Sequence, residues 1–96
     1  TTLARGKLAL FPDAVTTRGR KHLVELARMV DEGHRAVILF LVSRADVTRF
    51  APADDIDPEY GRTLREVAAH GVEALAYTTR VEPGRIEIAR KLPIKL

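Results

Sequence analysis

The feature that most restricts the fold of this chain is a run of seven apolar residues, Ala36–Val42. The run shows no alternation of apolar and polar side chains, which is typical of a strand that is covered on both faces. A segment with helical periodicity lies on each side of it, at residues 18–32 and 58–70. In both segments apolar residues recur at spacings of three and four, so each offers one stripe for burial. A helix, a buried strand and a second helix predict an α/β domain with a mostly parallel sheet.

Shorter strands complete the predicted sheet. Residues 3–11 predict a hairpin that turns at Arg5-Gly6. Residues 72–81 predict a further strand, and residues 85–91 are expected to return as an edge strand after a turn at Pro83-Gly84. The predicted fold is therefore a mixed sheet with flanking helices.

The start of the second helix is the clearest boundary in the sequence. Asp57 is expected to be its N-cap and Pro58 its first residue, because an aspartate accepts from free helical amides and a proline lacks the N–H that would need an acceptor. Residues 43–56, just before it, are polar and predict an irregular loop. The predicted order is hairpin-α-β-α-β-β, which makes one small domain over residues 1–96.

Composition excludes several classes of protein. The chain has no Cys, which excludes disulfides and thiolate metal sites and favours a reducing, cytoplasmic compartment. Its longest apolar run is far shorter than the roughly 20 residues that span a bilayer, and we expect no membrane partner. There is no signal-peptide pattern and no initiating Met, so the chain is expected to be a fragment of a longer protein.

Positive charge gathers toward the two ends of the sequence. The net charge is +3, with seven Lys and Arg against four Asp and Glu in residues 1–35 and an acidic middle section. This distribution is compatible with a polyanionic partner, and equally with a role in solubility alone. The sequence leaves the oligomeric state open.

The most distinctive segment places cations where a helix is expected to begin. Its residues are Arg18, Gly19, Arg20, Lys21 and His22. Cations at a helix N-terminus oppose the helix dipole, whereas the free amides there favour an anion. A phosphate group would relieve the repulsion, and a glycine would allow the backbone to approach it closely. The alternative is a solvated basic turn, with Gly19 present for packing.

Two further residues are candidates for the same chemistry. Arg44, after the predicted central strand, is expected to add a phosphate contact. Asp13 is a candidate catalytic and metal-binding residue, because carboxylates are the natural ligands of Mg²⁺. Capping of the turn after Pro12 is the alternative for Asp13. No histidine pair has metal-ligand spacing, and the acidic run in residues 54–59 is explained by a solvated loop and a helix cap.

Several segments of the chain closely resemble the sugar fermentation stimulation protein family. The resemblance spans almost the whole chain and is carried by Phe11–Leu26, Glu32–Val37, Phe50–Asp54, Ile56–Tyr60, Gly71–Tyr77 and the closing Leu92-Pro93. It implies the C-terminal part of a restriction-endonuclease-like domain. An N-terminal OB-like domain and the upstream half of the nuclease-like domain would be absent.

The resemblance also implies a function. Family members are described as binding DNA without sequence preference, with a proposed regulatory role in maltose metabolism. The family's Glu-x-Lys pair would lie just before Thr1, so this chain is expected to lack catalysis and to need no cofactor, with Mg²⁺ reserved for the intact protein. Three hypotheses remain: a DNA-binding module, a metal-dependent nuclease in the intact protein, and a protein-interaction role of residues 43–56.

Overall fold

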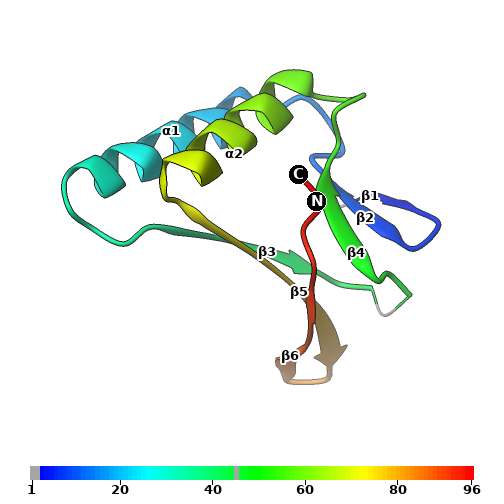
Figure 1. Cartoon of the computed structure of the whole chain (residues 1–96). Coiled ribbons are helices and arrows are strands. Elements are labelled where there is room, and N and C mark those ends of the chain that lie inside the picture. The colour runs from blue at the N-terminus through cyan, green and yellow to red at the C-terminus, as the bar shows by residue number, and fades with distance from the viewer. Residues whose placement is uncertain (1–2, 45) are drawn as a thin grey trace.

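The computed structural model describes residues 3–44 and 46–96, which form two three-stranded sheets and two helices (Figure 1). The smaller sheet contains β1 (Leu3–Arg5), β2 (Leu8–Phe11) and β4 (Arg49–Pro52), in that order. The larger sheet has the order β3-β5-β6, from β3 (Val37–Val42), β5 (Glu73–Glu82) and β6 (Arg85–Leu92). The mixed α/β architecture predicted from the sequence is confirmed, with two sheets in place of one.

The small sheet differs in two details from the prediction. In the hairpin, Arg5 pairs with Leu8, so the turn residues are Gly6 and Lys7, one position later than predicted. Gly6 has a φ of 59°, a left-handed conformation that glycine adopts without steric cost. The second difference is β4, which lies in the segment predicted to be an irregular loop and pairs in parallel with β2. Ala45, in the same segment, lies outside the described residues.

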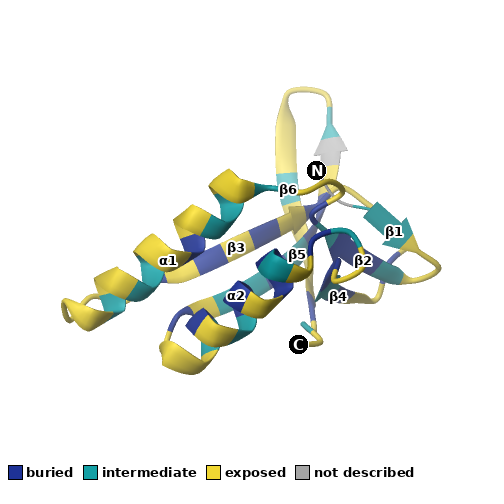
Figure 2. Ribbon diagram, turned by 90° about the horizontal axis from the view of Figure 1, so that it is seen from above, coloured by how far each residue is buried: buried dark blue, intermediate teal, exposed yellow. Residues whose placement is uncertain are grey.

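The apolar run at Val37–Val42 forms a strand, as predicted, but it is not covered on both faces. Its side chains alternate between buried and exposed (Figure 2). Ile38, Phe40 and Val42 are buried, whereas Leu39 and Leu41 are 48% and 49% exposed. The cause is the layering, because both helices cover the same face of this sheet (Figure 1). β3 is also an edge strand among the described residues, with β5 as its parallel neighbour.

The helices begin and end within one residue of their predicted bounds. Helix α1 spans Thr17–Asp31 with Thr16 as its N-cap, and α2 spans Pro58–His70 with Asp57 as its N-cap. Gly71 ends α2 in the left-handed conformation, at a φ of 118°. Neither helix is long and apolar enough to cross a membrane.

One hydrophobic core joins the helices to both sheets. Leu23 of α1 and Leu64 of α2 are fully buried in it, together with Phe40 of β3 and Phe50 of β4. The Phe40 and Phe50 rings stack with their centroids 4.5 Å apart. The C-terminal segment adds a second connection, because Ile94 bridges Phe50 and so links the end of β6 to the small sheet. This core fixes the positions of both helix starts.

Candidate phosphate-binding site at two helix N-termini

The two helices start side by side at one end of the molecule. β2 and β4 are parallel neighbours whose last residues, Phe11 and Pro52, are paired. The chain leaves the end of β2 to enter α1, and it leaves the end of β4 to enter α2. The helices then run in the same direction and pack against each other (Figure 1). Two positive helix ends are therefore brought together, and a negative group between them is favoured.

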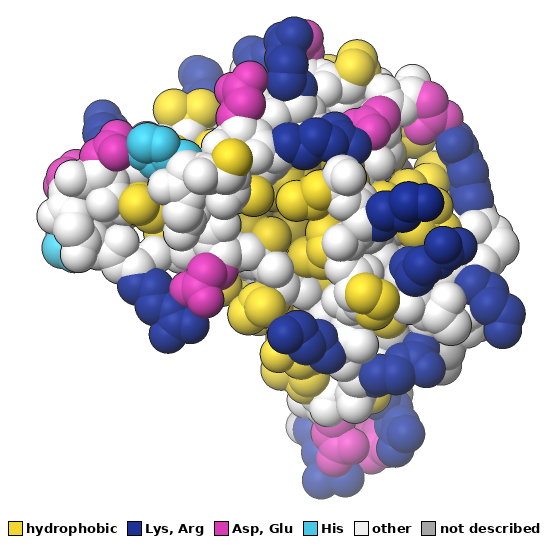
Figure 3. All heavy atoms as spheres, viewed as in Figure 1, with side chains coloured by type: hydrophobic (Ala, Val, Ile, Leu, Met, Phe, Trp, Pro, Cys, Tyr) yellow, Lys and Arg dark blue, Asp and Glu magenta, His cyan; other side chains and the backbone are white. Residues whose placement is uncertain are grey.

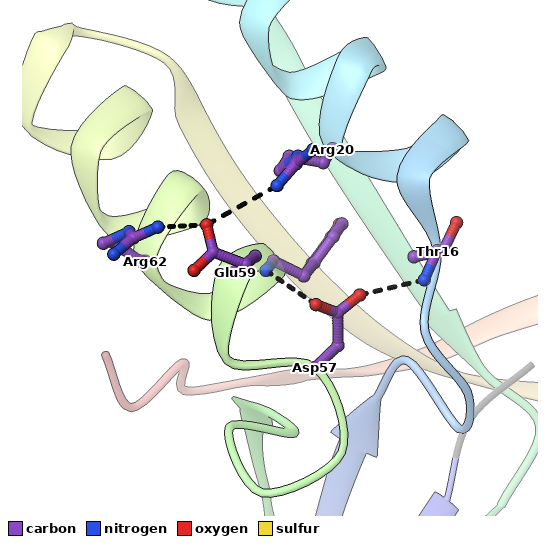
Figure 4. A network of polar contacts seen from close by, with 6 residues as sticks. Thr16, Arg20, Asp57, Glu59 and Arg62 are labelled. Carbon is purple, nitrogen blue, oxygen red and sulfur yellow. Dashed lines mark hydrogen bonds and ion pairs between the residues drawn. The ribbon is translucent and has the colours of Figure 1, made fainter.

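Asp57 supplies that negative group. It is 4% exposed and one carboxylate oxygen, Oδ1, accepts from the Tyr60 amide at 3.1 Å, which caps α2. The other oxygen, Oδ2, accepts from the Thr16 amide at 2.9 Å, at the N-cap of α1 (Figure 4). A single carboxylate thus holds both helix starts. The sequence predicted the first of these bonds; the second spans 41 positions and carries no local signal.

Only some of the first amides of α1 have a hydrogen-bond acceptor among the described residues. A helix begins with four N–H groups that have no acceptor within the helix. At α1 these belong to residues 16–19. Asp57 accepts from Thr16, and the Thr16 hydroxyl accepts from Gly19 at 3.0 Å. Among the described residues, no acceptor serves the amides of Thr17 and Arg18, and these two amides remain for solvent or a ligand.

The cations of the helix start fall into two groups. Arg20 points toward α2, where its guanidinium lies 3.5 Å from the Glu59 carboxylate. Arg62 of α2 contacts the same Glu59 oxygen, so two arginines share one carboxylate (Figure 4). Arg18 and Lys21 are exposed and form no ion pair with any described residue. They are the cations of α1 that remain available to an external anion.

Gly19 has a packing role in this site. A Cβ at position 19 would lie 2.9 Å from Thr16 Cγ2 and 3.1 Å from the ring of Tyr60. Since real Cβ atoms essentially never approach within 3.0 Å, a larger residue would push the helix start away from Tyr60. This contact supports the packing explanation for Gly19, while its role beside a phosphate stays a prediction.

Tyr60 and His22 line an open cavity of about 350 Å³ between α1 and β3. Tyr60 is 1% exposed and packs edge-on against Phe11, with ring centroids 5.3 Å apart. Burial, with the nearby carboxylate of Asp57, raises the pKa of Tyr60 above its ordinary value, so the hydroxyl stays protonated. His22 is exposed at the cavity rim.

The remaining predicted site residues are Arg44 and Asp13. Arg44 forms a bidentate pair with Asp46, at 2.9 and 2.7 Å, and this hydrogen bond lowers the pKa of Asp46. Asp13 is exposed in the loop between β2 and α1. The described residues contain no group of three or more His, Asp or Glu side chains that could hold a metal ion. The metal and catalytic roles of Asp13 therefore stay predictions.

The acidic run before α2 serves the structure. Asp54 accepts from both terminal nitrogens of Arg65, at 2.9 and 2.7 Å, which lowers the pKa of Asp54. Asp55 forms an ion pair with Arg5 at 2.6 Å. Gly61 is required beneath the first of these pairs, because a Cβ there would lie 1.9 Å from Asp54 Oδ1. The predicted loop-and-cap explanation of this run agrees with these contacts.

Comparison with known proteins agrees with this architecture. Residues 1–85 match a family model described as the sugar fermentation stimulation protein RE domain. A sugar fermentation stimulation protein homolog from Geotalea uraniireducens is 58% identical over 95 residues, covering 99% of this chain and 41% of the relative. The homolog from Syntrophotalea carbinolica is 56% identical over 96 residues, covering all of this chain and 42% of the relative.

A solved structure extends the similarity to three dimensions. The structure of Pyrococcus furiosus SfsA in complex with Ca²⁺ superposes with a TM-score of 0.89 at 32% identity, over 98% of this chain and 41% of that one. The fold is thus an α/β fold of the nuclease-like type. The chain belongs to the sugar fermentation stimulation protein family, and it spans about two fifths of the length of the relatives it matches.

Proposed function

We propose that this chain is a DNA-binding module that contacts the phosphate backbone at the start of α1. The observation that carries the proposal is that the amides of Thr17 and Arg18 and the charged groups of Arg18 and Lys21 have no partner among the described residues. Free amides at a helix N-terminus are donors for a phosphate oxygen, and the helix dipole favours the same anion. Arg20 contributes a further positive charge, shared with Glu59.

Such contacts position a protein on DNA without reading its sequence. Phosphate oxygens are the same at every base pair, so binding through them carries no direct sequence information. The chain has five aromatic residues and no Trp, which disfavours a platform for stacking unpaired bases. We therefore propose duplex binding without sequence preference, in a protein that regulates sugar metabolism, with maltose metabolism as the role implied by the family resemblance.

The salt dependence of binding tests the proposal. Each phosphate contact releases a counterion and contributes about 0.9 to the log–log slope of affinity against salt. Three cations at the helix start predict a slope of about −3, and the double variant Arg18→Ala/Lys21→Ala should reduce its magnitude by about 1.8. A flat salt response of the unmodified chain would remove the proposal.

The matched control for this test is Arg28→Ala/Arg85→Ala. Arg28 lies near the end of α1 and Arg85 begins β6, and each forms a surface ion pair with a carboxylate three positions away. The control removes the same net charge from sites away from the helix start. Its slope should stay close to that of the unmodified chain.

A second candidate function is metal-dependent cleavage of DNA by the full-length protein. The observation in its favour is that the Pyrococcus furiosus relative was solved in complex with Ca²⁺. The described residues of this chain do not form a metal site by themselves, so cleavage would need carboxylates from elsewhere in the protein. We propose that these come with an upstream half of the nuclease-like domain, which follows an OB-like domain.

Cleavage by full-length protein separates the two candidates. The nuclease hypothesis predicts Mg²⁺-dependent cutting that falls sharply in Asp13→Asn. The binding hypothesis predicts intact DNA in both proteins at every Mg²⁺ concentration, with affinity unaffected by the substitution.

A further inference from the structure

A second group of cations surrounds the start of β4, away from the helix start. Lys7 is joined to this strand through its carbonyl, which accepts from the amides of Thr48 and Arg49 at 2.7 and 3.3 Å. Lys95 donates its amide to the carbonyl of Phe50 at 2.7 Å. The guanidinium of Arg90 reaches across from β6 to the carbonyl of Val47. Three separate segments thus bring positive residues to the four positions 47–50.

We call these four residues the β4 basic surface: Lys7, Arg49, Arg90 and Lys95. All four are exposed, and none forms an ion pair with a described residue. Two carboxylates lie in the same region and both have arginine partners, since Asp46 is bound by Arg44 and Asp55 by Arg5. Lys7 also helps to lower the pKa of Asp46 through its charge. The four cations are therefore in excess over the acids around them.

The space-filling view agrees with this excess. Lys and Arg side chains gather on the side of the molecule that carries the small sheet, at the right of Figure 3. In that view acidic side chains lie at the upper margin of this side and at the tip of the β5–β6 hairpin. Such uniform charge on an open surface costs stability through self-repulsion unless a polyanion covers it.

Among the described residues, a polar contact of the side chain explains one of these cations and leaves the others without a structural role. Arg90 has a structural bond, to the carbonyl of Val47, which anchors β6 to the start of β4. Arg49 and Lys95 have no such bond from their side chains to a described residue, and both are held through their backbones. Neighbouring surface positions carry arginines that do have carboxylate partners, such as Arg5 and Arg44. The unpaired cations of this region thus share one patch.

Two members of the β4 basic surface lie at the opposite end of the small sheet from the helix starts, and Lys95 lies beside the middle of β4. Lys7 and Arg49 stand at the amino ends of β2 and β4, whereas α1 and α2 follow their carboxyl ends. A four-residue strand rises about 3.3 Å per residue, so the two sites are roughly 13 Å apart. Duplex DNA carries one charge per about 1.7 Å of its axis, which places about eight phosphates over that length. One duplex could therefore contact both sites.

We propose that the β4 basic surface is a second phosphate-backbone contact for the nucleic acid that binds at the start of α1. The inference rests on the proposed function and adds to it a second surface and a direction for the bound duplex. The duplex crosses the small sheet from the helix starts toward the amino ends of β2 and β4. Binding by this surface involves charge and hydrogen bonds to phosphate, with no contribution from base stacking.

The test compares four forms of the chain by duplex affinity at several salt concentrations. They are the unmodified chain, the helix variant Arg18→Ala/Lys21→Ala, the sheet variant Arg49→Ala/Lys95→Ala, and the combination of all four changes. Arg90 is left in place because its loss would disturb the start of β4. The control is again Arg28→Ala/Arg85→Ala, and circular dichroism checks that each form is folded.

The proposal predicts that the sheet variant reduces the magnitude of the salt slope by about 1.8, as two lost phosphate contacts should. With three cations at the helix start and four at the β4 basic surface, the slope of the unmodified chain should be about −6, and the combination should reduce its magnitude by about 3.6. If only the helix variant changes the slope, the second surface is excluded and the proposed function stands. If only the sheet variant changes it, the second surface stands and the helix start is excluded. A flat slope in the unmodified chain excludes both.

A membrane is the other polyanion that such a surface could meet. Vesicles containing an anionic phospholipid provide the comparison, at the same salt concentrations as the duplex. We expect the sheet variant to weaken duplex binding and to leave any vesicle binding unchanged. Loss of vesicle binding alone would overturn the proposal.

Discussion

The two helix starts differ in how many of their free backbone amides have an acceptor within the protein. At α2, the amide of Asp57 bonds to Ala53, Pro58 has no N–H, and Asp57 itself accepts from Tyr60. Among the described contacts, the amide of Glu59 is the single open donor there, and it belongs to an acidic residue that suits the positive helix end. At α1, two amides stay open and the first turn contains no acid.

Under the proposed function, this difference separates a helix start with a structural role from one that binds a ligand. The start of α2 follows every rule that stabilises a helix end, and its carboxylates point inward and toward α1. The start of α1 breaks the dipole rule with Arg18 and Lys21, at a cost of about 0.3–1 kcal/mol for each charge. A local violation of this kind is expected at functional sites, because a ligand can supply what the helix lacks.

The largest expected effect is that of Asp57→Ala. The substitution removes the acceptor of two amides at once, one on each helix, and each unsatisfied donor costs about 1–3 kcal/mol. We expect a loss of about 3 kcal/mol in the free energy of unfolding, measured by urea denaturation. A loss under about 1 kcal/mol would show that the shared carboxylate does not hold the helix starts together.

Loss of the α1 cap should have a smaller effect. Thr16→Ala removes the hydroxyl that accepts from Gly19, which should lower the free energy of unfolding by about 1 kcal/mol. Thr16→Ser keeps the hydroxyl and serves as the control, with little change expected in the same urea experiment. Equal losses in the two variants would mean that the methyl group matters and the cap does not.

The cations of α1 should reduce stability while they promote binding. Replacing Arg18 and Lys21 by Ala removes charges that oppose the helix dipole, so we expect the chain to become more stable by about 0.5 kcal/mol. The same variant should bind duplex DNA less tightly. The comparison between the helices would fail if this variant were destabilised by a similar amount, because the cations would then have a structural role.

A small effect on stability is also expected at Glu59. Glu59→Gln breaks two exposed ion pairs, with Arg20 and Arg62, and such pairs contribute about 0.2–1 kcal/mol. The release of Arg20 should at the same time increase the affinity for duplex DNA, measured by fluorescence anisotropy. Unchanged affinity would indicate that Arg20 takes no part in binding.

Local signals predicted the helices and missed the contacts between segments. Asp57, Pro58 and Gly71 act within one turn of their own position, so the bounds of α2 follow from the sequence. β4 has only four residues and exists through its pairing with β2, about 40 positions earlier, which no local pattern reports. The run at Val37–Val42 predicted a strand correctly, but its composition does not say which faces other elements will cover.

In the candidate site, too, the features that lie close together in the sequence were predicted and the contacts between distant segments were not. The sequence identified the basic helix start, since its residues are contiguous. It did not show that Glu59 neutralises Arg20, that Asp46 binds Arg44, or that Tyr60 packs on Gly19. The β4 basic surface was missed for the same reason, because its four residues come from four places in the chain.

The most direct measurement is a titration of the isotope-labelled chain with a duplex, followed by amide NMR signals. We expect large shifts for the amides of Thr17 through His22, strongest at Thr17 and Arg18. The amides of Tyr60 through Arg62, in the first turn of α2, should move little. Unmoved signals at the start of α1, or larger shifts at the start of α2, would contradict this expectation.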